Sequence, residues 1–256
     1  MRYWITAVLS CLALVVSGCS GDSAAKSVDQ GDCVQQSGDD FTKVDCSSAQ
    51  AKYVVLKKLS GSEYTCKDVA GVTYTYYNDS RQVCLGDKGA DPQQASNTAR
   101  KGDCLTDSSA PPVHKFPCTD SRTIYKVLER KDGGLTNFAC DGVAGTEVTY
   151  TWELKQIGNG TKLPKLGPDL IFCLAHKEVD PARALENAKA GDCLRDTTIK
   201  PNLEITGCGA GDAKYRVLKV VVQSSQCDNV HGATSSFTFT PGGLALPRVY
   251  CVAKLR

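Results

Sequence analysis

Gly31-Asp32-Cys33 opens the stretch that decides the fold, and Val83-Cys84-Leu85 closes it. Between them lie Cys46, the segment Tyr53-Val54-Val55-Leu56 and the motif Cys66-Lys67-Asp68-Val69-Ala70-Gly71. The same features recur in the same order in two further stretches, Gly102 to Leu174 and Gly191 to Val252. Self-similarity at this scale is the signature of a repeat architecture, so we predict three copies of one small domain.

The spacing inside the copies is regular. In each copy a tyrosine follows the second cysteine by seven residues, and the third cysteine begins Cys-x-x-Val-x-Gly. An aromatic-Thr-aromatic triplet comes next, and it reads Tyr74-Thr75-Tyr76, Tyr150-Thr151-Trp152 and Phe237-Thr238-Phe239 in the three copies. We therefore expect these triplets to be equivalent.

The cysteines indicate disulfide bonds. Of the fourteen, Cys11 lies in an apolar leader and Cys19 in a lipidation motif, which leaves four per copy. An even number per repeat in an exported chain predicts a disulfide framework, whereas zinc sites and thioredoxin-type redox sites need close cysteine pairs that are missing here. Four cysteines allow three pairings, and we favour first with second and third with fourth because the first separation is nearly constant. The twelve cysteines are Cys33, Cys46, Cys66, Cys84, Cys104, Cys118, Cys140, Cys173, Cys193, Cys208, Cys227 and Cys251.

The beginning of the chain predicts export and a lipid anchor. Residues 1–18 have a positive start, an apolar core of signal-peptide length and small residues, which is typical of a signal peptide. Val16-Ser17-Gly18-Cys19 matches a bacterial lipobox, in which Cys19 receives the lipid. An ordinary secretory signal or an uncleaved anchor is the alternative. Residues 19–30 are small and polar and suit a flexible tether. We expect the protein on the outer face of the bacterial cytoplasmic membrane.

The residue patterns predict an all-β fold. Tyr53-Val54-Val55 and its counterparts alternate in the manner of half-buried strands, and the leucine that follows predicts a bulge or a second buried face. Other segments of each copy are also rich in β-branched and aromatic residues. We expect three tandem, disulfide-stapled β-domains, each a meander or partly open barrel of four or five strands. Their expected bounds are 31–90, 102–179 and 191–256.

The joints between copies are expected to be short helices. Cys84 and Cys104 are twenty residues apart, as are Cys173 and Cys193, and both joints carry Asp-Pro at the same place. Aspartate is a good N-cap, proline suits the first helical turn, and alanine with long polar side chains favours helix. We therefore predict linker helices over 91–101 and 180–190.

No catalytic residue, metal ligand or cofactor site stands out. His114, His176 and His231 fall at unrelated points of the copies, and the aspartate of each Gly-Asp-Cys has no recurring carboxylate partner, so we expect a turn role for it. The net charge of +2 gives no basic field for nucleic acid. We expect a protein that is not an enzyme.

The triplets are the best candidates for a binding surface. Tyr74, Tyr76 or Trp152 could stack on a sugar or a peptide, although core packing is the alternative. The insertion from Ile157 to Pro168 in the second copy is expected to be an exposed loop, which either carries recognition or is a tolerated insertion.

The Gly-Asp-Cys, Lys-Tyr-x-Val-Leu, Cys-x-x-Val-x-Gly and Val-Cys-Leu segments resemble the LppU-type lipoproteins of actinobacteria. The resemblance extends over about residues 31–252 and implies an exported, disulfide-containing envelope domain without an assigned activity. We expect a lipid-anchored, non-catalytic binding or scaffolding protein whose partner is an envelope protein or a wall component. A spacer that sets reach from the membrane and an enzyme acting on envelope polymers are the alternatives, and the sequence is silent on oligomeric state.

Overall fold

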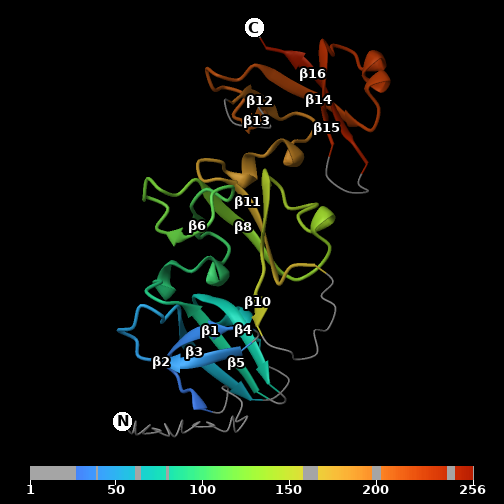
Figure 1. The fold of residues 1–256 in the computed structure, drawn as a ribbon. Helices are drawn as coiled ribbons and strands as arrows, with labels where there is room; N and C mark the ends of the chain where they lie inside the picture. Colours follow the sequence, from blue (N-terminus) through green and yellow to red (C-terminus); the bar gives the residue numbers. More distant parts are fainter. Residues whose placement is uncertain are drawn as a thin grey trace, which may run out of the picture.

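The computed structural model describes residues 27–38, 40–60, 65–78, 81–157, 167–197, 203–240 and 246–255. The expected signal peptide, the expected lipidation site Cys19 and most of the expected tether lie outside these residues. The described part is an all-β protein, as predicted, with three sheets that follow one another from the blue end of the chain to the red end (Figure 1). All strand pairs are antiparallel except one in the first sheet. We call them repeats 1, 2 and 3.

The three sheets share one strand order. The central strand of each sheet begins at the recurring tyrosine of the repeat (Tyr53, Tyr125 or Tyr215), and we call it the tyrosine strand. On one side it pairs with the hairpin formed by the first two strands of the repeat. On the other side it pairs with the strand that contains the fourth cysteine, and the strand that contains the aromatic triplet lies beyond that one. Repeat 1 has β1 (Cys33–Ser37), β2 (Asp40–Val44), β3 (Tyr53–Ser60), β4 (Val72–Asn78) and β5 (Arg81–Asp87). Repeat 2 has β6 (Cys104–Leu105), β7 (Lys115–Phe116), β8 (Tyr125–Asp132), β9 (Val148–Trp152) and β11 (Leu170–His176). Repeat 3 has β12 (Cys193–Asp196), β13 (Leu203–Thr206), β14 (Tyr215–Val221), β15 (Ser235–Phe239) and β16 (Arg248–Lys254).

The leucine that follows the Tyr-x-Val segment of each repeat lies at a β-bulge. The pairing of β3 with β5 skips Leu56, and the pairings of β8 with β11 and of β14 with β16 skip Leu128 and Leu218. A bulge adds a residue to one strand and turns its side chain out of the regular alternation. The predicted bulge is therefore confirmed in all three repeats, and Leu56 packs on a second cluster behind its sheet.

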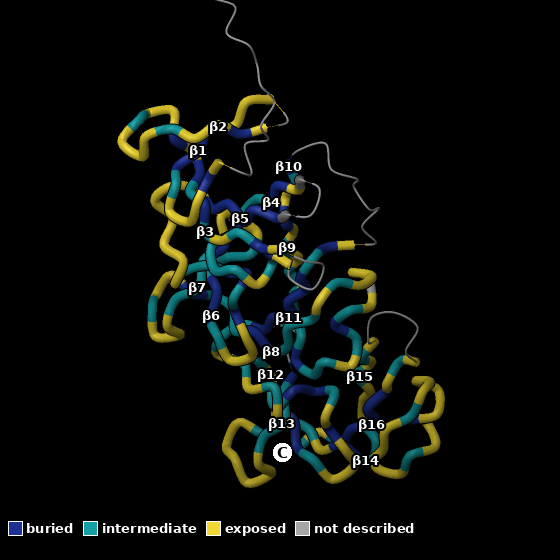
Figure 2. Tube along the Cα trace, turned by 90° about the horizontal axis from the view of Figure 1, so that it is seen from below, coloured by how far each residue is buried: buried dark blue, intermediate teal, exposed yellow. Residues whose placement is uncertain are grey.

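Each repeat has its own core on one face of its sheet. The three clusters are formed largely by equivalent apolar residues, and Figure 2 shows buried segments along the middle of the molecule with exposed turns around them. Val28 is fully buried in the first cluster and occupies the place that Ala99 and Ala188 have in the next two. The expected boundary at residue 31 is therefore wrong, because Val28 already belongs to the folded unit and not to the tether.

Six disulfide bonds staple the described residues, and all six have the favoured pairing. The first bond of each repeat closes the N-terminal hairpin, and the second ties the Cys-x-x-Val-x-Gly loop to the strand of the fourth cysteine, with Cα atoms 5.0–5.4 Å apart throughout. Domains of this size are near the lower limit for a single core, and each bond adds about 2–4 kcal/mol of stability. The bonds are Cys33–Cys46, Cys66–Cys84, Cys104–Cys118, Cys140–Cys173, Cys193–Cys208 and Cys227–Cys251.

The expected equivalence of the aromatic triplets is wrong by two residues in repeat 1. Tyr150 lies opposite Phe172 and Phe237 opposite Tyr250, whereas the residue opposite the equivalent Val83 is Tyr76, not Tyr74. Side chains along a strand alternate between the two faces of the sheet with a period of two. Aligning the triplets two residues out of register therefore still places the aromatic rings on the core face, so the sequence pattern gives no sign that the alignment is wrong. The true equivalents of Tyr74 are smaller residues, Val148 and Ser235.

Candidate functional site

The joints between repeats are pairs of 3₁₀ turns rather than the single helices that were predicted. The first joint has η2 (Pro92–Gln94) and η3 (Ser96–Thr98), and the second has η5 (Pro181–Arg183) and η6 (Leu185–Asn187). The predicted caps are present, because Asp91 and Asp180 accept backbone hydrogen bonds at the start of each joint with proline following.

The helix is interrupted by an alanine between the two turns of each joint. Ala95 and Ala184 are held away from helical geometry by single β-bridges to the next repeat, Ala95 with His114 and Ala184 with Glu204. This tertiary pairing outweighs the helix propensity of alanine.

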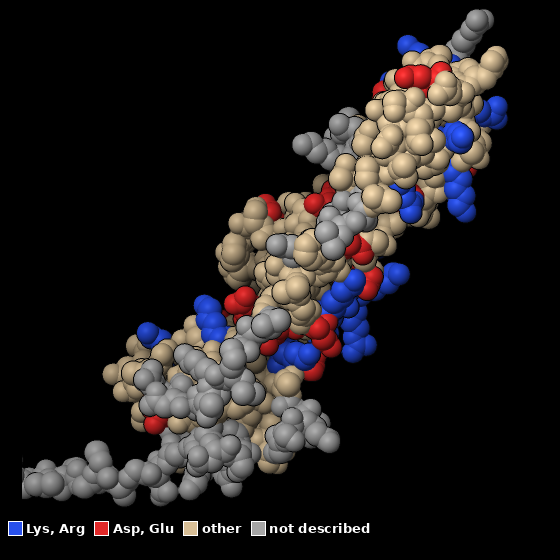
Figure 3. Space-filling model, turned by 90° about the vertical axis from the view of Figure 1, so that its right-hand side faces the viewer, with Lys and Arg blue, Asp and Glu red and all other residues tan. Residues whose placement is uncertain are grey.

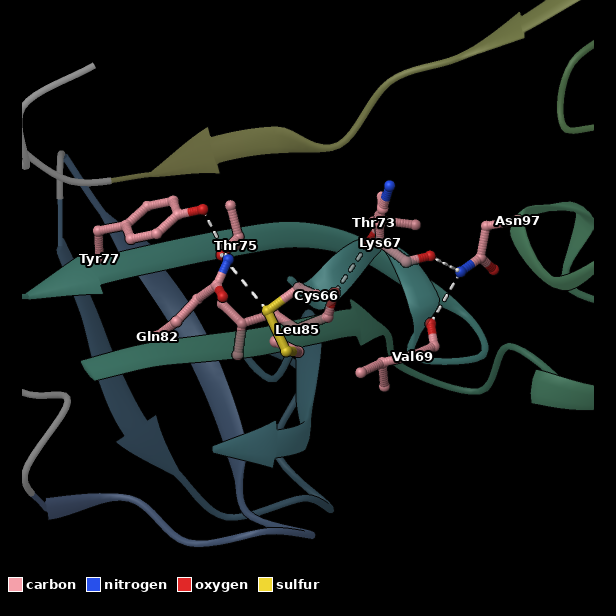
Figure 4. The surroundings of a disulfide bond; sticks show 10 residues. Cys66, Lys67, Val69, Thr73, Thr75, Tyr77, Gln82, Leu85 and Asn97 are labelled. Atoms are coloured by element: carbon pink, nitrogen blue, oxygen red, sulfur yellow. Dashed lines mark hydrogen bonds between the residues drawn. A yellow bond between two sulfur atoms is a disulfide. The ribbon is translucent and has the colours of Figure 1, made fainter. Parts of the chain in front are cut away.

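Each joint is fixed to both repeats that it connects. The Asn97 side chain donates to the carbonyl oxygens of Lys67 and Val69 at 2.8 Å each and accepts from the Gly71 amide at 3.2 Å, and Figure 4 shows the two donated bonds. At the second joint Glu186 accepts from the Gly145 amide at 2.8 Å. The last alanine of each joint is buried in the core of the following repeat, so the joints are rigid connections.

The glycine of the Cys-x-x-Val-x-Gly motif is required for this connection. Gly71 and Gly145 have φ of +79° and +81°, a conformation that side chains rarely adopt. A Cβ at either position would lie 3.4 Å from the Cα of the proline in the following joint, Pro92 or Pro181. The joint therefore packs directly against the backbone of these loops.

Joint 1 is reinforced by a strand that repeat 2 contributes to repeat 1. β10 (Lys155–Ile157) pairs in parallel with β4 and extends the first sheet to six strands (Figure 1). Ile157 is buried in the first core, and Leu154 packs with Trp152 on the cluster around the Cys66–Cys84 bond. The expectation of an exposed loop from Ile157 to Pro168 is thus wrong at both ends, because Ile157 and Pro168 are buried, and residues 158–166 lie outside the described part.

Ion pairs close the outer side of the same joint. Arg130 of repeat 2 lies 3.0 Å from the carboxylate of Asp68 in repeat 1, and Lys67 lies 3.4 Å from Asp132. Figure 3 shows charged side chains of both signs gathered where the first two repeats meet. The first two repeats are therefore held together by strand pairing, apolar packing and charge.

A groove of about 330 Å³ lies at joint 1 and is the best candidate binding site. Its walls are the start of β4, the joint itself and the end of β9 with the residues after it. Three aromatic side chains line it, and they come from both repeats: Tyr74, Tyr150 and Trp152. Asp87, Asp91, Gln94, His114 and Lys155 supply polar groups around them.

The structure thus brings together two of the three residues predicted to form a binding surface. Tyr74 and Trp152 are half-buried and line the groove. Tyr76 is only 7% exposed and packs edge-on against Phe41 in the core, so its prediction as a surface residue is wrong. Tyr150 and His114 were missed, because no sequence signal shows which parts of neighbouring repeats meet at a joint.

Burial affects two tyrosines in and beneath the groove. Burial raises the pKa of Tyr150. Tyr53 lies beneath Tyr74, with ring centroids 4.8 Å apart, and burial together with the hydrogen bond to Tyr74 raises the pKa of Tyr53 to about 12. The Lys155 ammonium lies 5.5 Å from the Tyr74 ring centre. The groove offers flat apolar faces beside hydrogen-bonding groups, which is the composition of a ligand site.

A second groove lies at joint 2, with a volume of about 710 Å³. Repeat 2 contributes the loop from Cys140 to Ala144 together with Glu147 and Thr149, and repeat 3 contributes Val222, Phe239 and Leu246 to Arg248. This groove has about twice the volume of the one at joint 1, and each of the two grooves is lined by three acidic side chains and by one lysine or arginine.

The remaining candidates have structural positions. The aspartates of the three Gly-Asp-Cys motifs each accept a hydrogen bond from the backbone amide three residues earlier, as expected for a turn. His176 lies against Tyr125 and His231 in an exposed loop, far in sequence from the His114 position. Among the residues that the structure describes, no cluster of three or more His, Cys, Asp or Glu side chains is arranged to hold a metal ion.

None of the family models, curated proteins or solved structures compared with this chain matches it. The resemblance to LppU-type lipoproteins therefore stays a prediction. No helix within the described ranges has the length and apolar character needed to cross a membrane.

Proposed function

We propose that this protein is a lipid-anchored, non-catalytic binding or scaffolding module on the outer face of the bacterial cytoplasmic membrane, and that the groove at joint 1 is its ligand site. The membrane is reached through lipidated Cys19, and the ligand is a wall component or an envelope protein. The observation that carries the proposal is the meeting of Tyr74, Tyr150 and Trp152 in one groove.

The chemistry of this groove favours a sugar ring as the ligand. The apolar face of a sugar can lie on Tyr74 or Trp152, while Asp87, Gln94 and His114 are placed around them to bond its hydroxyl groups. Its volume is at the lower end of the range of small-molecule pockets, which suits one ring of a longer wall glycan. The rigid joint supports the proposal too, because pre-formed sites lose little ordering entropy on binding.

The test is co-sedimentation of the full-length protein in detergent with purified cell-wall glycan. Tyr74→Leu removes the aromatic face but keeps much of the packing volume, and Tyr77→Leu is the matched control because Tyr77 is exposed and outside the groove. We expect binding to fall at least fivefold in Tyr74→Leu and to be unchanged in Tyr77→Leu. Equal binding by both variants, or enrichment of nothing from native envelopes after crosslinking, would remove the basis of the proposal.

A spacer is the second candidate, and the locked joints favour it. Pro92 on Gly71 and Pro181 on Gly145 fix the direction of each repeat relative to the next. The repeats follow one another along an extended molecule (Figure 3). Small-angle scattering separates the candidates when combined with the groove variants: a spacer requires a rigid extended particle whose cellular role survives Tyr74→Leu, whereas a binding module loses its role in that variant.

A further inference from the structure

The outer face of repeat 1 is covered, whereas the equivalent face of repeat 2 is open. Thr75 on β4 is 2% exposed and its hydroxyl contacts the sulfur of Cys66, whose cluster Leu154 and Trp152 complete. Figure 4 shows β10 running beside β4. The equivalent residue of repeat 2, Thr149, is exposed and lines the groove at joint 2. The fold therefore presents this surface in all three repeats: it is occupied in repeat 1, and within the described residues it is unoccupied in repeat 2 and in repeat 3, where Ser236 takes the place of Thr149.

The clusters behind the two sheets show the same contrast. Around the Cys66–Cys84 bond, Leu154 and Trp152 of repeat 2 complete the apolar packing. Around the Cys140–Cys173 bond the cluster contains residues of repeat 2 alone, and Val143 and Cys140 face the groove. At the edge, β4 pairs with β10, whereas β9 is the last strand of its sheet and has no further neighbour in the described structure.

The charge of the open groove is acidic. Asp141, Glu147 and Glu186 line it against one cation, Arg248, whose guanidinium already donates to the Glu186 carbonyl oxygen at 2.6 Å. Within the described residues, Glu147 Oε1 and Glu186 Oε2 are buried and have no hydrogen-bond partner. Burial also raises the pKa of Glu147. Buried carboxylate oxygens without a donor are costly, and a cationic ligand would satisfy them.

The opposite wall of the groove is apolar and exposed. Leu246 is 73% exposed, Val222 is also exposed, and Phe239 and Pro247 complete the wall. The volume of about 710 Å³ leaves room for several residues of an extended chain. The shape, the sheet edge and the acidic wall fit one kind of ligand.

We propose that the groove at joint 2 binds an extended, positively charged segment of a partner protein, which adds to the edge of β9 as β10 adds to β4. Such strand addition draws affinity from main-chain hydrogen bonds and specificity from the side chains beside them. An apolar residue placed like Leu154 would cover the Cys140–Cys173 cluster, and its basic neighbours would meet Glu147 and Glu186. The side chains that line this groove differ from those that line the aromatic groove at joint 1, although β9 contributes to both, so substitutions in either groove test one proposal without the other.

The probe for this site is the segment that covers repeat 1, made as the labelled peptide Trp-Glu-Leu-Lys-Gln-Ile with the sequence of residues 152–157. Fluorescence anisotropy with the full-length protein in detergent measures binding. A peptide carrying Glu153→Lys should bind at least fivefold more tightly than the native sequence, and one carrying Lys155→Glu at least fivefold more weakly. No binding of any peptide, or an order of affinity that ignores charge, would overturn the proposal.

Protein variants locate the site. Leu246→Asp and Glu147→Gln should each weaken peptide binding at least fivefold. Leu135→Asp should leave it unchanged, because Leu135 is a comparably exposed leucine, at 64%, outside the groove. A photoreactive group at the Leu154 position should attach to repeat 2, and attachment to β4 of repeat 1 would contradict the proposal. Concentration-dependent dimers that Leu246→Asp abolishes would assign the groove to a second copy of the chain and would likewise overturn it.

Discussion

Asn97→Ala tests the rigidity of joint 1, on which the aromatic groove depends. The side chain is 2% exposed and makes three hydrogen bonds to the Cys66 loop of repeat 1. Each neutral hydrogen bond contributes about 1 kcal/mol net, and a buried amide left without a partner costs about 1–3 kcal/mol. The substitution leaves the Gly71 amide without its hydrogen-bond acceptor. We expect Asn97→Ala to lower the free energy of unfolding by about 3–5 kcal/mol.

The assay is urea unfolding of the oxidised protein, combined with hydrogen exchange of the peptide that contains residues 65–72. The exchange of this peptide should rise most, because the Gly71 amide loses its acceptor. A loss of about 3 kcal/mol corresponds to a fall in melting temperature of about 6–12 °C for a chain of this size. Two substitutions at joint 2 serve as comparisons. Glu186→Ala removes one bond between the buried Gly145 amide and a charged acceptor and should cost about 1.5–3 kcal/mol, and Asn187→Ala removes an exposed side chain with one bond and should cost less than about 1 kcal/mol.

The reasoning would be refuted if Asn97→Ala cost less than about 1 kcal/mol, the value of a single hydrogen bond. It would also be refuted if Asn97→Ala and Asn187→Ala behaved alike. Either result would mean that the joint is not held by its side chains and that the two repeats are oriented by the strand β10 alone.

Three further predictions follow from burial and charge. Ile157 belongs to repeat 2 but is buried in the core of repeat 1, so Ile157→Ala should leave a cavity there and destabilise repeat 1 by about 2–4 kcal/mol. Hydrogen exchange of the β4 amides should become faster in this variant. Under mild reduction, mass-tag alkylation should modify the bonds with an exposed sulfur first, those of Cys46, Cys118 and Cys208, and equal labelling of all six bonds would contradict this. The pKa of Tyr53 is raised to about 12 in the folded state, so its contribution to stability is complete below pH 10 and is lost as the pH rises toward 12; Tyr53→Phe should flatten that part of a stability–pH curve.

The repeat pattern predicted most of the fold because cysteines and glycines report geometry that few other residues can provide. The near-constant separation of the first two cysteines indicated a hairpin staple, and the Cys33–Cys46 bond and its counterparts are that staple. The leucine that follows the Tyr-x-Val segment indicated a bulge or a second buried face, because it broke the alternation of apolar and polar residues at the same position in all three copies. Val28 was wrongly assigned to the tether, although the pattern contained the signal for it: Val28 precedes Asp32 by the four residues that separate Ala99 from Asp103.

What the sequence did not predict depends on contacts between repeats. The strand β10 is three residues long and belongs to a sheet formed by the preceding repeat. Three residues are too few for an alternation of apolar and polar side chains to predict a strand. The joint alanines have high helix propensity, yet Ala95 and Ala184 are extended because they pair with the next repeat. The aromatic groove gathers residues from two repeats, and its existence follows from the angle at which they meet.

The two joints differ in a way that bears on function. Both use the same elements: a capped 3₁₀ turn, a proline against the loop glycine, and a side chain that accepts from that glycine's amide. Only joint 1, within the described residues, adds a strand, three apolar side chains and ion pairs between the repeats it connects. If the repeats served only to set a distance, one kind of joint would be sufficient for both positions. The segment from Trp152 to Ile157 of repeat 2 instead covers one face, whereas the equivalent face of repeat 2 is open beside an acidic wall, and this difference between the joints favours the proposed binding module over a uniform spacer.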